Sequence, residues 1–206
     1  MECLKLLFGT GNPAKFSGMK KRLEGLPIEL ISLREMDKAP DIQEEGKDPR
    51  ENARMKAEAY WDVYQIPVFS CDTGLFIKEL PDPLQPGVHV RRQGSRSMSD
   101  EEMTAYYAGL ARTYGRLTAR YQNAVCLILD ARHRYESMAD ELSGNPFWIT
   151  DRPHPRTVEG YPLDRISLQI PSGAYYYDIQ EKEPDGREID RAFRRFFEQA
   201  LSDWNQ

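Results

Sequence analysis

The segment most suited to chemistry is Gly9-Thr10-Gly11-Asn12-Pro13-Ala14-Lys15, which follows the apolar run Leu4–Phe8 directly. Asn12 is a residue type that caps helices, and a proline suits the first helical position because its missing N–H leaves no bond unmade. The glycines let the backbone turn sharply, and free N–H groups at a helix start, with Lys15 one turn in, favour an anion such as phosphate. A strand–turn–helix unit that binds nothing is the alternative.

A second cluster combines acids with an asparagine and a lysine at helical spacing. Glu44 and Glu45 precede a helix whose start is marked by Asp48-Pro49-Arg50-Glu51. Within that helix, Asn52 and Lys56 are four residues apart, so they project from one face. Carboxylates suit Mg²⁺, and amide and ammonium donors suit phosphate oxygens, so the cluster predicts a site for a magnesium-bound phosphate chain. A solvated acidic loop beside an ordinary surface helix is the alternative.

A third cluster, Cys71-Asp72-Thr73-Gly74, lies between two short apolar runs, Pro67–Ser70 and Leu75–Ile77. We expect these runs to be strands that flank a turn, which places the Asp72 carboxylate at a strand end, where α/β proteins carry their sites. There the carboxylate can ligate a metal or orient an attacking water. A turn aspartate that bonds to its own backbone is the alternative.

Two arginines form a fourth candidate. Pro86-Gly87-Val88 predicts a rigid turn, and Arg91 and Arg92 follow it. Their guanidinium groups match phosphate oxygens, so the pair is a candidate for phosphate binding. Ordinary surface arginines in a loop are the alternative.

The elements that must position these side chains begin as strand, helix, strand. The expected elements are strands at Leu4–Phe8 and Ile28–Leu33, helices at Pro13–Leu23 and through Ala53–Tyr64, a helix from the Ser99 cap to about Thr113, a hairpin of Ala119–Leu129 with Tyr135–Ala139, and an amphipathic helix at Glu188–Leu201. Residues 81–86 and 144–162 are rich in turn formers and are expected to be loops. This order predicts an α/β fold with a mixed sheet.

Composition narrows the function classes. The 206 residues suit one domain, and 40% hydrophobic with 30% charged residues is typical of a globular protein. A net charge of −5 disfavours nucleic-acid binding, and without a run of ~18 apolar residues or a basic-then-apolar start we expect neither a membrane span nor a signal peptide. Cys3, Cys71 and Cys126 have no metal or disulfide spacing, which indicates a cytoplasmic protein.

In order and spacing, the motifs Thr-Gly-Asn-x-x-Lys, Glu-x-Gly, Glu-Asn-Ala-x-x-Lys-Ala, Asp-Thr-Gly-Leu and Pro-Gly-Val resemble those of the inosine triphosphate pyrophosphatase family. The resemblance runs from about residue 6 to 94. It implies a single elongated α/β domain over residues 1–206, in which a long twisted mixed sheet with flanking helices forms two lobes around a central nucleotide-binding cleft. It also implies a homodimer with Mg²⁺ as cofactor. The implied reaction is hydrolysis of a nucleoside triphosphate, of the deaminated purine type (ITP, XTP or dITP), to monophosphate and pyrophosphate.

The resemblance implies roles for individual positions as well. Glu44 and Asp72 would bind the metal, and Asp72, Lys15 and Lys56 would be catalytic, with Asp72 serving the metal or the attacking water. Contacts to the substrate are implied for Thr10, Gly11, Asn12, Lys15, Asn52, Lys56, Thr73, Gly74 and Arg92.

The chain also departs from the family pattern. Most relatives have two adjacent acids where this chain has Cys71-Asp72, so one carboxylate is missing. The Phe-Gly-Tyr-Asp-Pro segment that helps to hold the base has a weak echo in Ser143–Trp148. The Ser-His-Arg signature near the C-terminus is missing: Asp190 stands where histidine is expected, with Arg187 or Arg191 as possible substitutes.

These departures leave the base specificity and two other functions open. One is a related hydrolase for a different nucleotide, whose pocket the Pro153–Pro162 loop and Ala174–Tyr177 could shape, although ordinary aromatic packing also explains the tyrosines. The other is a nucleotide-binding protein that has kept the phosphate site without turnover.

Overall fold

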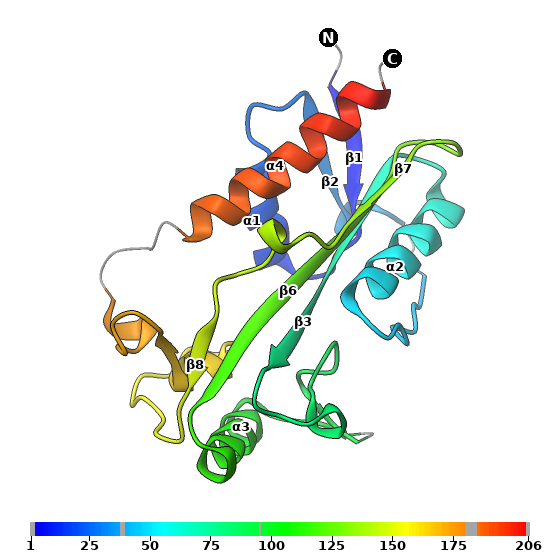
Figure 1. Cartoon of the computed structure of the whole chain (residues 1–206). Helices are drawn as coiled ribbons and strands as arrows, with labels where there is room; N and C mark the ends of the chain where they lie inside the picture. The colour runs from blue at the N-terminus through cyan, green and yellow to red at the C-terminus, as the bar shows by residue number, and fades with distance from the viewer. Residues whose placement is uncertain (1–2, 38–39, 95, 180–184, 205–206) are drawn as a thin grey trace. The chain divides into compact units, whose positions relative to one another are not determined.

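The computed structural model describes residues 3–37, 40–94, 96–179 and 185–204 (Figure 1). Its helices are α1 (Pro13–Arg22), α2 (Pro49–Tyr64), α3 (Asp100–Tyr114) and α4 (Asp185–Trp204). Its strands are β1 (Leu4–Phe8), β2 (Ile28–Ser32), β3 (Val68–Ile77), β4 (Arg92–Gln93), β5 (Arg96–Ser97), β6 (Leu117–Ile128), β7 (Arg134–Ser137), β8 (Phe147–Ile149) and β9 (Ser167–Gln169). Hydrogen bonding orders the main sheet β2-β1-β3-β6-β8-β9, with β7 on β6.

The chain forms two compact units. Unit 1 comprises residues 1–73, 122–143 and 187–206, and unit 2 comprises residues 74–121 and 144–186. Strands β3 and β6 contribute residues to both units.

In unit 1, strand β1 is the point at which the order of the strands along the sheet reverses. It pairs in parallel with β2 on one side and with β3 on the other. Helix α1 connects β1 to β2, and α2 lies between β2 and β3 in the chain. Because such crossovers are right-handed, helices that lead to opposite sides of β1 cover opposite faces of the sheet, as Figure 1 shows. A switch point of this kind is where open α/β sheets bind ligands, at the carboxyl ends of the strands.

Each face of the unit 1 sheet has its own apolar core. On one face, Phe8 and Phe69 stack at 4.3 Å and pack with Met19 of α1 and Phe197 of α4. On the other face, the α2 side chains Ala53, Ala57 and Tyr60 pack against Leu7 and Val68. The strands are thus buried on both faces, and helices on both faces hold the segments that follow the strand ends.

Unit 2 has a separate core. Helix α3 packs Met103, Tyr107 and Ala111 against side chains of β6 and β8, with Leu117 and Ile149 fully buried. The helix starts at a capping box, in which the Ser99 hydroxyl accepts from the N–H of Glu102 and the Glu102 carboxylate accepts from the N–H of Ser99.

The α/β fold with a mixed sheet is confirmed, with parallel pairs β1–β2 and β1–β3 and antiparallel pairs β6–β7, β6–β8 and β8–β9. The expected helices and the hairpin are present with small shifts at their ends. Strand β8 lies in the segment that we expected to be loop, so that expectation is wrong there. Among the described residues, no helix combines the length and the apolar character that a membrane crossing requires.

The expected turn at Cys71-Asp72-Thr73-Gly74 is wrong. Residues Val68–Ile77 form one continuous strand, and Asp72 lies within it rather than at its end. Aspartate, threonine and glycine favour turns locally, but sheet pairing and burial decide strand formation in a protein interior. Side chains alternate along this strand, which gives residues 71 and 72 opposite faces of the sheet.

Candidate functional site

The turn after β1 has the capped geometry that the sequence predicts. The Asn12 side-chain oxygen accepts from the backbone N–H of Lys15 at 3.3 Å, and the Thr10 hydroxyl accepts from the N–H of Asn12 at 3.2 Å. The Lys15 side chain is exposed at the start of α1. Gly9 cannot carry a side chain, because a Cβ there would lie 2.2 Å from the Ser70 hydroxyl oxygen. The turn is therefore tightly packed against β3 at Gly9 and exposed to solvent at Lys15.

Helix α2 supplies the second group of side chains. The Asp48 carboxylate accepts from the N–H of Glu51 at 2.9 Å, and Pro49 occupies the first turn, so the helix starts where the sequence indicates. Asn52 and Lys56 are both buried, on the helix face that packs on the sheet. The interpretation of α2 as an ordinary surface helix at these positions is wrong.

Lys56 and Asp72 form a buried ion pair that also includes Glu44. The Lys56 Nζ atom lies 2.8 Å from Asp72 Oδ1 and 3.1 Å from Glu44 Oε2. The side chains of Lys56 and Asp72 are each 11% exposed, and that of Glu44 is 43% exposed. The two predicted metal ligands therefore converge on the ammonium group of Lys56, which is itself a predicted phosphate ligand.

The surroundings keep Lys56 charged. Burial alone would lower the pKa of its ammonium group, but the carboxylates of Asp72 and Glu44 outweigh burial, so the pKa is raised above its ordinary value. At neutral pH the three side chains therefore carry a fixed arrangement of one positive and two negative charges.

Asn52 connects this ion pair to the Glu44 loop. Its Nδ2 donates to Asp72 Oδ2 at 3.0 Å, and its Oδ1 accepts from the N–H of Gly46 at 2.8 Å. With 2% of its surface exposed, Asn52 holds Asp72 and the loop together. Gly46 is required here because a Cβ would lie 2.8 Å from the backbone nitrogen of Asn52. A direct contact of Asn52 with substrate stays a prediction.

The two carboxylates of Glu44 and Asp72 are a small donor set, but one that fits magnesium. Mg²⁺ is commonly bound by one or two carboxylates, with water and substrate phosphates completing the shell, and Glu44 and Asp72 supply two carboxylates. Among the described residues there is no group of three or more histidine, cysteine, aspartate or glutamate side chains that could hold a metal without substrate. A metal held by these two carboxylates would complete its coordination with water or phosphate.

Cys71 does not belong to this cluster. Its side chain packs against the apolar core on the α1 and α4 side, whereas Asp72 faces α2. Burial raises the pKa of the Cys71 thiol to about 12, so the thiol is neutral at physiological pH. An acidic side chain at position 71 would therefore project from this apolar face of the sheet, which is opposite to the face that carries Asp72.

The remaining predicted residues have different surroundings. The Thr73 hydroxyl donates to Asn123 Oδ1 at 2.8 Å, within unit 1. Gly74 and Arg92 belong to unit 2, where Gly74 is buried and Arg92 is exposed. Arg91 pairs with Asp100 at 2.6 Å, which gives it a structural partner. The role of Thr73, Gly74 and Arg92 toward a substrate stays a prediction.

The sequence interpretation missed Arg34. This exposed arginine follows β2 and, with Thr10, Gly11 and Asn12, lines a cavity of about 110 Å³. The available signal was topological: β1 and β2 are parallel neighbours, so residues that follow them meet at one edge of the sheet.

The family model described as the Ham1 family matches residues 6–165. The chain belongs to the Ham1 family. It is 29% identical over 172 residues, 82% of each chain, to the dITP/XTP pyrophosphatase of Geobacter sulfurreducens. It is 32% identical over 148 residues, 68% of this chain and 75% of the relative, to the dITP/XTP pyrophosphatase of Porphyromonas gingivalis. The Staphylococcus aureus Ham1 protein has the same fold, with a TM-score of 0.74 at 18% identity over 95% of this chain and 98% of that one. The predicted family is thus confirmed.

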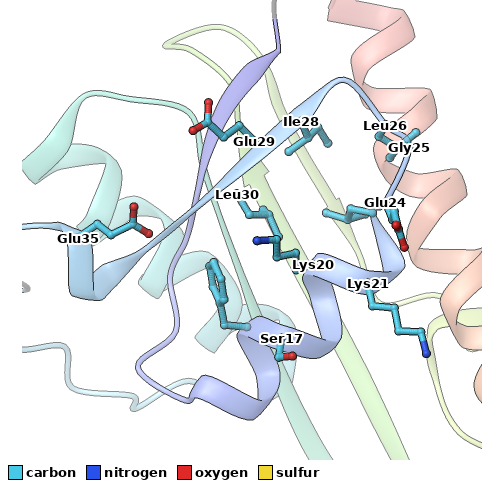
Figure 2. A pocket seen from close by; sticks show the side chains of 12 residues that line it. Ser17, Lys20, Lys21, Glu24, Gly25, Leu26, Ile28, Glu29, Leu30 and Glu35 are labelled. Atoms are coloured by element: carbon cyan, nitrogen blue, oxygen red, sulfur yellow. The ribbon is translucent and has the colours of Figure 1, made fainter.

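A second cavity of this Ham1 chain is lined by none of the three ion-pair residues. It measures about 720 Å³ and is lined by α1, β2 and the segment between them (Figure 2). Its charged lining side chains are two lysines and three glutamates, Lys20, Lys21, Glu24, Glu29 and Glu35. A lining with an excess of negative charge does not favour a polyphosphate.

Several residues at which the chain departs from the Ham1 pattern make structural contacts. Asp190, where histidine is expected, accepts from Arg22 Nε at 2.5 Å and ties α4 to α1. Arg191 is exposed, and the side chain of Arg187 lies outside the described residues. In unit 2, the rings of Tyr175 and Tyr177 both pack against His154, at 5.1 and 5.4 Å between centroids. Aromatic packing therefore accounts for these tyrosines.

Proposed function

We propose that this protein hydrolyses nucleoside triphosphates to monophosphate and pyrophosphate with Mg²⁺, and that its substrates are deaminated purine nucleotides such as ITP, XTP and dITP. The observation that carries the proposal is the convergence of Asp72, Glu44 and Lys56 beside the switch point of the sheet. Membership of the Ham1 family and the names of its relatives support the reaction type.

The positively charged and N–H groups bind the triphosphate. The start of α1 favours an anion through the helix dipole, and Lys15 and Arg34 add exposed positive charge at the same end of β1 and β2. A triphosphate carries about four negative charges near neutral pH, so these groups must offset its charge before water can approach phosphorus.

Asp72 orients the attacking water and accepts its proton. The water oxygen forms a bond to the α-phosphorus, the bridging bond from this phosphorus to the leaving pyrophosphate breaks, and the proton goes to the carboxylate. Asn52 holds that carboxylate in place through the contact at 3.0 Å, and Lys56 contacts it at 2.8 Å in the absence of substrate. Mg²⁺, held by Glu44 and Asp72 when it is bound, would supply further neutralisation of the phosphate charge.

The test is product analysis with a panel of purine and pyrimidine nucleoside triphosphates. Pyrophosphate rather than orthophosphate should be released, and in ¹⁸O-water the label should appear in the monophosphate. No release of pyrophosphate from any nucleotide would refute the proposal. The panel must include pyrimidines because Asp190, at the position expected to read the purine, pairs with Arg22 instead.

We also propose that the protein is cytoplasmic, as its cysteine usage indicates, and that it is a homodimer, as the family resemblance implies. Light scattering at micromolar concentration should give twice the monomer mass of 23.8 kDa. A monomer mass would contradict this part of the proposal without affecting the reaction.

A further inference from the structure

The cation that Glu44 and Asp72 share in this structure is the ammonium group of Lys56. The Nζ atom contacts Asp72 Oδ1 at 2.8 Å and Glu44 Oε2 at 3.1 Å. The second oxygen of Asp72 accepts from Asn52 Nδ2 at 3.0 Å. Both oxygens of Asp72 and one of Glu44 are therefore engaged within the protein before any metal arrives.

A divalent ion competes directly with this ammonium group. To coordinate both carboxylates, the ion must bind beside the ammonium group that already contacts one oxygen of each, and it brings two positive charges close to a third. Lys56 and Asp72 are largely shielded from water, so solvent does little to screen that repulsion. The arrangement opposes binding of metal alone.

We propose that Lys56 acts as a gate that makes metal binding at Glu44 and Asp72 conditional on the nucleotide. The inference rests on the proposed function and deepens it. A triphosphate offers the ammonium group other anionic oxygens, and the flexible four-carbon stem of lysine allows Nζ to leave the carboxylates. The carboxylates then become available to the metal that accompanies the phosphates.

Such a gate couples the two ligands. If the nucleotide raises the affinity for metal by some factor, the metal raises the affinity for the nucleotide by the same factor. Replacement of Lys56 by a neutral residue should remove much of the coupling, because the two carboxylates would then attract free metal without opposition. If Lys56 only supported the structure, its loss would instead let the two carboxylates separate and weaken metal binding.

The test is the binding of Mn²⁺ alone, which suits the same oxygen ligands, measured by electron paramagnetic resonance and by calorimetry. Lys56→Met should bind Mn²⁺ about tenfold or more tightly than the wild type, in keeping with lost repulsion of at least one unit of log K. Lys56→Arg keeps the charge and should resemble the wild type. Lys47→Met, which removes an exposed lysine of the same loop region, is the matched control for net charge.

Coupling is then measured with a triphosphate analogue that has a methylene group between the α- and β-phosphorus. The analogue should raise the Mn²⁺ affinity of the wild type more than that of Lys56→Met. Equal or weaker binding of Mn²⁺ by folded Lys56→Met overturns the proposal. Should that variant fail to fold, a wild type that binds Mn²⁺ equally well with and without the analogue overturns it. Pyrophosphate release by the wild type tests the reaction separately, so the two failures are distinguishable.

Discussion

Replacement of Asp72 by asparagine removes a charge from the centre of the candidate site while keeping its shape. Two unit charges about 4 Å apart interact by about 4 kcal/mol at an effective dielectric constant near 20. Glu44 still pairs with Lys56 at 3.1 Å, and an asparagine oxygen can still accept one bond. We therefore expect Asp72→Asn to lower the free energy of unfolding by about 1–3 kcal/mol, which a protein of ordinary stability survives.

The effect of Asp72→Asn on activity should be much larger. An asparagine side chain cannot accept the proton of the attacking water, so the rate of pyrophosphate release should fall about 10²–10⁴-fold. Affinity for nucleotide without metal should hardly change, because Lys15 and the turn after β1 make those contacts in the proposal. Undiminished turnover by the folded variant would refute the assignment of Asp72.

A double-mutant cycle separates the ion pair from the chemistry. In Asp72→Asn, Lys56 keeps a buried charge with one partner fewer, and Lys56→Gln removes that charge. The double variant should therefore be more stable than the sum of the single losses predicts, by about 1–3 kcal/mol in urea unfolding. Additive losses would show that the contact at 2.8 Å contributes no coupling energy.

Iodoacetamide at pH 8 should label the exposed Cys3 rapidly and Cys71 hardly at all, as read by peptide mass spectrometry, because burial raises the pKa of Cys71 to about 12. Gly46→Ala should reduce pyrophosphate release at least tenfold, because the added Cβ meets backbone at 2.8 Å and displaces the loop that carries the neighbouring acids. Arg34→Gln should raise KM severalfold and leave kcat nearly unchanged, since the arginine contacts the ground state and transition state alike. The stability that Lys56 adds over Lys56→Gln should be complete below pH 10.5 and should be lost as the pH rises through its raised pKa, as thermal melts between pH 8 and 12 would show.

For each of these predictions, one result would contradict the reasoning. Rapid labelling of Cys71 would mean that its strand opens, and full activity of Gly46→Ala would mean that the loop can move without consequence. A fall in kcat at unchanged KM would remove Arg34 from substrate binding. A wild type no more stable than Lys56→Gln at pH 8 would show that the charge of Lys56 does not contribute to stability.

The sequence predicted the helix starts in both units because their signals are local. Caps at Asn12, Asp48 and Ser99 depend on a few neighbouring residues, and all three make the hydrogen bonds that their types suggest. The helical spacing of Asn52 and Lys56 likewise placed both on one face, toward Asp72.

What the sequence did not predict depends on contacts between distant segments. The continuous course of β3 through Asp72 follows from sheet pairing and from Lys56, which offsets the buried charge, and neither is visible in the local composition. The position of Cys71 on the sheet face opposite to Asp72 follows from that strand as well. Arg34 became a candidate only when the pairing of β1 with β2 was known.

The core behind the site is assembled from the two ends of the sequence. Phe69 of β3 meets the edge of Phe197 of α4 at 4.9 Å, and Arg22 of α1 pairs with Asp190. During synthesis, β1, α1 and the strand that carries Asp72 must therefore leave the ribosome long before the helix that covers their apolar face. Until α4 emerges, α1 covers only part of that face, so unit 1 should reach its native state only late in translation. Folding yield in the cell should then depend on how quickly the ribosome finishes the chain and on chaperones that shield the exposed face meanwhile.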